Sequence, residues 1–255
     1  MTGAMDLTFY AAAIPAVILV GMSKGGFSGV GMLAMPVMAL ALPPIEAAAI
    51  MLPILIIQDM VSVASYWRTW DARNLRLLLP GACIGVGLGY QFAASVSDAA
   101  VSLAVGFISV TFGFYRLVID RRGPIRSTPR GHALLGFICG IGSGVTSMIV
   151  HAGGPPFQMF VMPQKLPHHT FVGTSVIFFS VMNLMKVPPY LLLSQLSARS
   201  LAVSLTLFPI AIASTLAGIW LVRRTSSDRF YTILYLLMIA IGIKLALDGG
   251  CALLT

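Results

Sequence analysis

Charged side chains are scarce in this sequence: Asp, Glu, Lys and Arg together make up 9% of its 255 residues. A soluble globular domain typically carries about a quarter charged residues, because these side chains keep its surface in water. The shortage excludes a cytosolic enzyme and a nucleic-acid binder, although the formal net charge is +8. Hydrophobic residues make up 58% of the chain. This composition predicts an integral membrane protein whose main partner is the surrounding lipid bilayer.

Cysteine and the usual catalytic signatures are also rare or missing. The three cysteines, Cys83, Cys139 and Cys251, lie in or beside apolar runs and are predicted to be packing residues. The sequence has no CxxC spacing, no HExxH, no GxSxG and no Walker A pattern. We therefore expect no metal site, no cofactor, no enzymatic activity and no ATP-driven pumping.

Long apolar runs take up most of the chain. About 20 apolar residues in a helix are enough to cross the hydrocarbon core, whereas barrel strands would alternate apolar and polar residues. The apolar segments fall at roughly 7–20, 31–42, 45–66, 74–94, 98–118, 132–150, 154–163, 170–193, 200–222 and 230–247. The sequence thus predicts an all-α polytopic membrane protein.

Two places along these runs are rich in glycine and proline. Residues 21–31 contain five glycines, and residues 151–156 read His-Ala-Gly-Gly-Pro-Pro. Neither stretch favours a regular helix, because Gly has a low helix propensity and Pro lacks the backbone donor. Each break precedes a short apolar run that ends in Pro. This recurrence predicts two repeats, residues 1–120 and 131–255, joined by a basic linker at 121–130.

The positions of the arginines bear on the topology. They cluster in residues 68–76, 121–130 and 223–229. Eight full spans would put the third cluster across the membrane from the other two. If each break is instead the tip of a re-entrant hairpin, which enters and leaves on one face, all three clusters are cytoplasmic, as the positive-inside rule favours. Each half then has one glycine-broken hairpin and three transmembrane helices, an odd number of crossings, so the repeats are inverted.

Helix packing has its own signal in the glycines. Gly81, Gly85 and Gly89 are four residues apart, and the same spacing recurs at 136, 140 and 144. Small residues at this spacing let helix backbones approach closely. We expect these glycines to serve packing.

Ionisable groups inside a membrane are rare and unfavourable, so each one needs a reason. Lys24 lies in the first break, just before Gly25-Gly26 and the expected start of a short second helix. A helix N-terminus, an ammonium and glycines that let a ligand approach the backbone together predict an anion site. The alternative is that Lys24 reaches a lipid headgroup from near the hairpin tip.

His151 occupies the corresponding place in the second break, before Gly153-Gly154. It could donate to an anion or carry a coupling proton, or it could be a neutral ring bonded to a carbonyl of the broken helix. In an inverted repeat, the N-termini of the two half-helices would converge near the membrane midplane and double the positive field. A small dianion would suit that arrangement.

Asp59 and Lys186 lie deep in two later segments, and the repeat aligns Asp59 with Asn183. Two interpretations stay open: the two charged residues neutralise each other structurally, or Asp59 takes a proton during transport while Lys186 contacts substrate. Neutral donors are expected from Gln158, Thr174, Ser175 and Asn183. The predicted substrate-binding residues are Lys24, Gly25, Gly26, His151, Gly153, Gly154, Gln158, Thr174, Ser175, Asn183 and Lys186, with Asp59 and His151 as candidates for proton coupling.

In this order the motifs resemble those of the TauE/SafE sulfite exporter family, also called the toluene sulfonate uptake permeases (TSUP). The resemblance rests on the two breaks, 24–36 and 151–156, on Thr170-Phe-Val-Gly-Thr-Ser175 and on the stretch from Asn183 to Lys186, and it covers nearly the whole chain. The first break departs from the family's common glycine triplet, because it reads Lys24-Gly25-Gly26-Phe27. The added fixed charge could narrow the range of substrates.

The resemblance implies secondary transport of sulfur-containing anions such as sulfite, sulfonates or sulfoacetate in a bacterial inner membrane. We expect export by alternating access, with one half rocking against the other around a site between the two breaks. The alternative function is a cation or metal permease that uses Asp59, although one buried acid makes a poor cation site. The sequence does not determine the exact anion, the coupling ion, the direction, or whether two copies form a homodimer.

Overall fold

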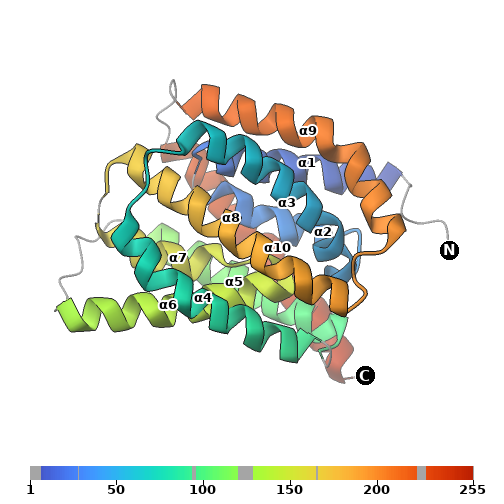
Figure 1. Ribbon diagram of the computed structural model, residues 1–255. Coiled ribbons are helices and arrows are strands. Elements are labelled where there is room, and N and C mark those ends of the chain that lie inside the picture. The colour runs from blue at the N-terminus through green and yellow to red at the C-terminus, as the bar shows by residue number, and fades with distance from the viewer. Residues whose placement is uncertain are drawn as a thin grey trace.

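The computed structural model describes residues 7–27, 29–93, 96–119, 129–164, 166–222 and 228–254, and these ranges contain helices and no strand. The elements are α1 (Leu7–Gly25), η2 (Val30–Leu33), α2 (Ala34–Ala39), α3 (Pro44–Tyr66), α4 (Ala72–Ala93), α5 (Asp98–Ile119), α6 (Pro129–Val150), α7 (Gly154–Val161), η3 (Met162–Gln164), α8 (His168–Leu192), α9 (Ala198–Val222) and α10 (Asp228–Leu254). Seven helices of the described chain are long and apolar enough to cross a membrane. The predicted all-α polytopic membrane fold is confirmed (Figure 1).

The short helices follow the two predicted breaks. α1 ends at Gly25, and the chain turns through Gly26 and Gly29, whose φ angles are 128° and 96°. These positive values favour glycine because a Cβ would clash with the backbone. α6 ends at Val150, and α7 begins at Gly154 with prolines in its first turn, where their missing N–H groups are tolerated.

One boundary differs from the expectation. The first break was expected to begin at Gly21, but α1 continues regularly through it to Gly25. A Cβ on Gly21 would collide with Ser214, and one on Gly25 would collide with the backbone at Gly218. These glycines therefore let α1 approach α9 closely, and the helix tolerates them because tertiary packing compensates for their low propensity.

The first break is the turn of a hairpin. Gln58 donates from Nε2 to the Val17 carbonyl (3.1 Å), and Tyr66 donates from its hydroxyl to the Gly25 carbonyl (2.7 Å). From the first contact to the second, the position moves eight residues forward along α3 and eight residues forward along α1. The two helices therefore run parallel. The segment through α2 returns the chain to the end at which α1 began, as the re-entrant interpretation requires. In Figure 1, α6 and α8 likewise start at one end of the molecule.

The helix ends next to the three arginine clusters lie together. Figure 1 shows the ends of α3, α5 and α9 and the starts of α4, α6 and α10 at its left-hand side. A cleft of about 420 Å³, lined by Glu46, Asp98 and Arg199, marks the starts of α3, α5 and α9 at the opposite end. Residues 121–128 of the expected linker, and Arg223 and Arg224, lie outside the described residues.

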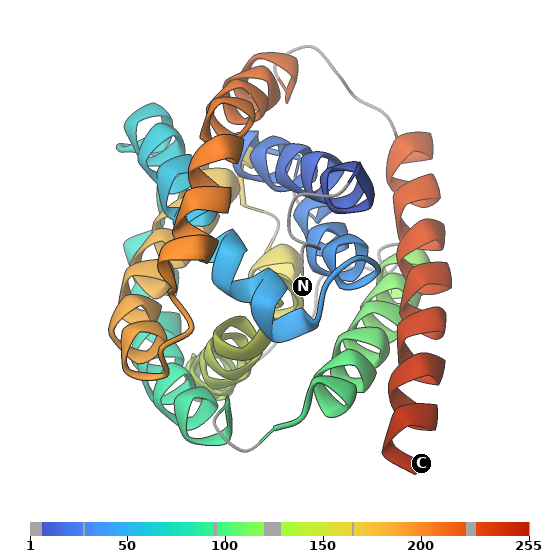
Figure 2. The ribbon, with the colours of Figure 1, turned by 90° about the vertical axis from the view of Figure 1, so that its right-hand side faces the viewer.

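The main helix contacts join the two halves of the sequence. α4 packs on α6, α5 on α10, α9 on both α1 and α3, and α3 on α8. If each helix is replaced by the helix at the same position in the other half, α4–α6 becomes α9–α1 and α3–α9 becomes α8–α4, which also pack together. The pairs α5–α10 and α3–α8 stay the same. An inverted repeat would produce this pattern, and the repeat itself stays a prediction. Figure 2 looks along the helices and shows α10 at the outer edge beside α5, with α7 in the interior.

Glycine contacts bring α4 and α6 together. A Cβ on Gly81 would collide with the Phe137 carbonyl, and one on Gly85 with the Ile141 carbonyl. In the reverse direction, Gly140 faces the Leu78 carbonyl. The predicted packing role of the glycines at four-residue spacing is confirmed.

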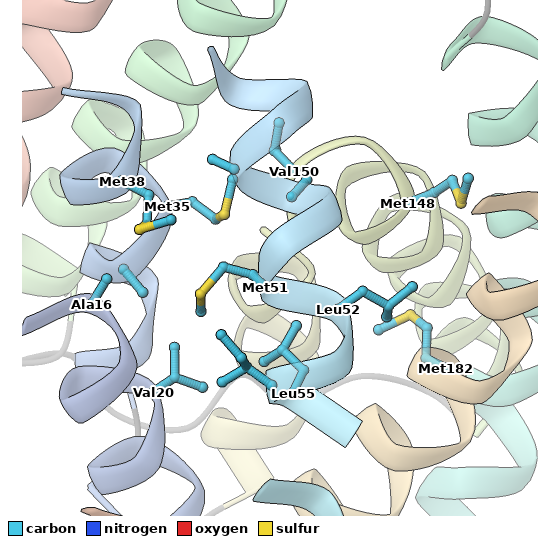
Figure 3. Close-up of a cluster of buried hydrophobic side chains, with 14 of the residues drawn as sticks. Ala16, Val20, Met35, Met38, Met51, Leu52, Leu55, Met148, Val150 and Met182 are labelled. Atoms are coloured by element: carbon cyan, nitrogen blue, oxygen red, sulfur yellow. The ribbon is translucent and has the colours of Figure 1, made fainter. Parts of the chain in front are cut away.

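The apolar core surrounds α3. In Figure 3, Met51 points toward Ala16 of α1, whereas Leu52 points toward Met182 of α8. All of these side chains are buried. A helix that is apolar on every side belongs in the middle of a helical bundle. α3 therefore carries polar residues such as Gln58 and Asp59 into the interior.

Candidate functional site

A cavity of about 110 Å³ lies between the two breaks. One water needs roughly 10–15 Å³, so the cavity has room for a small anion of several heavy atoms. Its lining comes from both halves of the chain: Val20, Ser23, Lys24, Gly29, Gly31, Met32, Ala34, Met35, Met51, Leu55, Ser147, His151, Gly154, Gln158, Ser175, Val176, Phe179 and Asn183.

Lys24 brings a positive charge to this cavity. It lies in the last turn of α1, and not in the break that was expected to separate α1 from the short second helix. A side chain in a helix leans toward the N-terminus, so the ammonium of Lys24 reaches back along α1. There it forms an ion pair with Asp59 of α3. Both side chains are largely buried, which makes this a pair in a medium of low dielectric constant.

Asp59 has a second partner from the other half of the chain. Asn183 of α8 donates from Nδ2 to Asp59 Oδ2 (2.6 Å), while Lys24 occupies Oδ1. Each carboxylate oxygen therefore has a donor. The expected alternative in which Asp59 and Lys186 form an ion pair is not what the structure contains, because Asp59 is paired with Lys24 instead.

The second break holds an imidazole against the same cavity. His151 has a φ of 54°, a left-handed conformation that is uncommon for a residue with a side chain. Its Nε2 lies 2.8 Å from the Ala48 carbonyl of α3, which can only accept, so Nε2 carries the hydrogen. Tyr190 stacks on the ring. Ser143 closes the turn by donating to the Gly153 carbonyl at 2.5 Å.

Lys186 lies behind His151 and is fully buried. Its Nζ is 2.6 Å from His151 Nδ1, 3.0 Å from Ser147 Oγ and 3.3 Å from the Ser147 carbonyl. Because Nε2 holds the hydrogen of the ring, Nδ1 accepts from the ammonium. Lys186 therefore acts on the cavity through His151 and Ser147 and does not line it.

Gln58 of α3 and Gln158 of α7 each have a buried oxygen that is unpaired among the described residues, and of the two it is Gln158 that lies at the cavity. It lines the cavity and is only 5% exposed, and its Oε1 has no hydrogen-bond partner among the described residues. A buried amide oxygen without a donor is unfavourable by about 1–3 kcal/mol, so a ligand that donates a hydrogen bond to it would bind more strongly.

The structure gathers part of the predicted site. The predicted residues that line the cavity are Lys24, His151, Gly154, Gln158, Ser175 and Asn183. Of the others, Gly25 packs on α9 and Gly26 faces Val222 and Tyr66. Gly153 packs against Ser143. Thr174 accepts from the backbone N–H of Asp71 at 2.9 Å, at the start of α4 and away from the cavity.

Sequence reasoning missed several lining residues. Ser23 directly precedes Lys24 and Ser147 lies one helical turn before His151, but no motif singles out either serine. Met32 touches Gly154 and so connects the two breaks directly. The flexible apolar wall of Met32, Met35 and Met51 could have been suspected only from the richness of the chain in methionine, 14 residues.

Comparison with known proteins gives one match. The family model described as "Sulfite exporter TauE/SafE" matches residues 13–245, which is most of the chain. The search of curated proteins and the search of solved structures gave no match.

Proposed function

Because this chain belongs to the sulfite exporter TauE/SafE family, we propose that it is a secondary transporter that exports small sulfur-containing anions, such as sulfite, sulfonates or sulfoacetate, across a bacterial inner membrane. The family is one of membrane transporters of sulfur anions such as sulfite, and the apolar helices make this chain a multi-pass membrane protein. The choice among these anions, the direction of transport and the bacterial inner membrane as its location are parts of our proposal.

The observation that carries this proposal is the cavity between the two helix breaks. One side presents the ammonium of Lys24, and the other presents the start of α7 and the side-chain amide of Gln158, whose NH2 group can donate to an anion while its unpaired oxygen can accept from a protonated one such as hydrogensulfite. Buried positive charge and hydrogen-bond donors at interrupted helices are the features by which transporters hold anions inside a membrane. The substrate-binding residues in this proposal are therefore those that line the cavity.

Alternating access would expose this cavity to each side of the membrane in turn. Helix contacts that glycines make close, such as α4 on α6 and α1 on α9, cross between the halves of the chain. Rocking of one intact half against the other would break both contacts. We therefore expect moving units that each combine helices from both halves. The helix ends that flank the arginine clusters lie at one end of the molecule, and the positive-inside rule supports placing that end in the cytoplasm.

The cation or metal alternative has less support. Both oxygens of Asp59 have donors, Lys24 and Asn183, so the carboxylate does not present a free oxygen to a cation. Within the described parts of the chain, no three His, Cys, Asp or Glu residues are close enough to hold a metal ion. Asp59 and His151 remain the candidates for carrying a coupling proton.

Uptake of labelled sulfite into proteoliposomes tests the function. The wild-type protein is expected to give a saturable flux. The double variant Lys24→Met/Asp59→Asn, which removes the cation without leaving an unpaired carboxylate, is expected to lower the flux at least about tenfold, because an ion-pair interaction with the anion is lost. Repeating the wild-type and Asp59→Asn measurements under a pH gradient tests proton coupling at Asp59.

The matched control is Lys244→Met. Lys244 belongs to an exposed ion pair with Asp248 one turn away on α10, so its removal should leave the flux unchanged. No sulfite or sulfonate flux in the wild type would reject the function. A normal flux in the double variant would keep the transporter but remove Lys24 from its site.

A further inference from the structure

The charges buried around the cavity do not cancel. Lys24 and Asp59 form one ion pair, whose sum is zero. Lys186 Nζ lies within hydrogen-bond distance of three groups, the carbonyl and hydroxyl oxygens of Ser147 and the Nδ1 of His151, which together could accept the three N–H donors of an ammonium. His151 is neutral in this arrangement, with its hydrogen on Nε2. With Lys186 as an ammonium, which is the premise of the inference below, the described residues of this cluster carry a net charge of +1.

A net charge is unfavourable in the interior of a membrane protein, because the surroundings solvate it poorly. An anion with one negative charge would bring the filled site to zero. An anion with two would leave it at −1. The convergence of two half-helices suggested a dianion from the sequence, but that expectation did not include a carboxylate paired with Lys24.

We propose that Asp59 sets the valence of the transported anion, and that the site prefers anions with a single negative charge, such as hydrogensulfite or a simple sulfonate, over dianions. This inference rests on the proposed function, because it assumes that the cavity holds the anion. Asp59 does not line the cavity, whereas both of its partners, Lys24 and Asn183, do. It is therefore a positioning residue that acts through its charge.

A pair of nearly isosteric probes tests this inference. Methanesulfonate carries one negative charge and sulfate carries two, and both are tetrahedral and keep their charge near neutral pH. Isothermal titration calorimetry on the purified full-length protein, at constant ionic strength, gives the ratio of their dissociation constants. The wild type is expected to bind methanesulfonate more tightly.

Asp59→Asn changes the site charge from +1 to +2 while keeping the size of the side chain and an oxygen that accepts from Asn183. It should shift the ratio toward sulfate by at least about tenfold, because a unit charge a few ångströms away inside a protein is worth more than that factor. Lys186→Met changes the site charge to zero and should shift the ratio in the opposite direction. The double variant Lys24→Met/Asp59→Asn keeps +1 and should keep the wild-type preference at lower affinity.

The control Asp248→Asn removes an exposed carboxylate on α10 and should leave the ratio unchanged. An unchanged ratio in Asp59→Asn would overturn the inference, and if that variant fails to fold, an unchanged ratio in Lys186→Met would overturn it. A wild type that carries sulfite but binds neither probe would also overturn it. Absence of sulfite flux would instead reject the proposed function, and the inference with it.

Discussion

The two helix breaks share a plan but hold their charges differently. In the first, the cation Lys24 lies at the cavity wall and pairs directly with a carboxylate. In the second, the cation Lys186 is fully buried, and a neutral imidazole separates it from the cavity. One break thus offers a compensated charge that a ligand can touch. The second break offers a positive charge without a carboxylate partner, and this charge acts on a ligand electrostatically across the His151 ring.

In each break, a hydrogen-bond partner comes from the other half of the chain. Asn183 of the second half donates to Asp59 of the first, and Ala48 of the first half accepts from His151 of the second. The two breaks are therefore not independent sites. A movement that separates α3 from both α8 and the second break would disturb both contacts, which gives a physical route by which opening the cavity is coupled to its charge state.

The largest effect on stability is expected when the compensated charge is broken. Lys24→Met leaves the Asp59 carboxylate buried with Asn183 as its remaining donor, and removing one partner of a buried ion pair typically destabilises by about 3–5 kcal/mol. The measurement is thermal unfolding of the purified protein in detergent, followed by tryptophan fluorescence.

The double variant Lys24→Met/Asp59→Asn should recover most of that loss, because no charge then remains unpaired. Lys244→Met, in the exposed pair with Asp248, should change stability by about 1 kcal/mol or less. If Lys24→Met were as harmless as Lys244→Met, the ion pair at the first break would not be a buried one, and the contrast between the breaks would fail.

A smaller effect is expected at the second break. Lys186→Met removes a charge that has no carboxylate partner and leaves neutral acceptors behind, of which His151 Nδ1 is the one that loses its donor. An unsatisfied buried acceptor is unfavourable by about 1–3 kcal/mol, less than an unpaired carboxylate. The same unfolding measurement should rank Lys186→Met between Lys24→Met and Lys244→Met. A loss as large as that of Lys24→Met would mean that the two cations are held alike.

The helices could be predicted closely from the sequence, because the lipid interior requires continuous apolar helices and forces Gly and Pro clusters to their ends. The exception is the end of α1. Gly21 looked like the start of a break, but it continues the helix because Ser214 of α9 packs into the space it leaves. Such a contact between distant segments is not visible in local sequence.

The sequence was enough to predict which residues form the site, but not which of them pair with each other. Lys24, His151 and Asn183 could be chosen because polar groups are rare in a membrane and these lie at breaks or deep in apolar runs. Which lysine would meet Asp59 depends on the direction of the Lys24 side chain and on the two oxygens of Ser147 that hold Lys186. Both depend on the packed fold.

The smallest effect concerns the backbone of the breaks. The first turns at Gly26 with φ 128°, a conformation that side chains rarely adopt, whereas the second turns at His151 with φ 54°, which a side chain tolerates at some strain. Gly26→Ala should therefore destabilise by about 1–2 kcal/mol in the unfolding measurement. Gly87→Ala is the matched control, because it lies inside α4 with open space around it and alanine favours the helix.

Transport measurements on Gly26→Ala distinguish a loss of stability caused by backbone strain from a loss of substrate binding. Gly26 does not line the cavity, so Gly26→Ala should reduce the amount of folded protein while the KM for sulfite stays at the wild-type value. A raised KM with normal stability would return Gly26 to the substrate site and would mean that the cavity extends past the turn. The first break would then bind the anion through its backbone as well as through Lys24, and the main contrast with the second break would lie in the charge of the cavity wall.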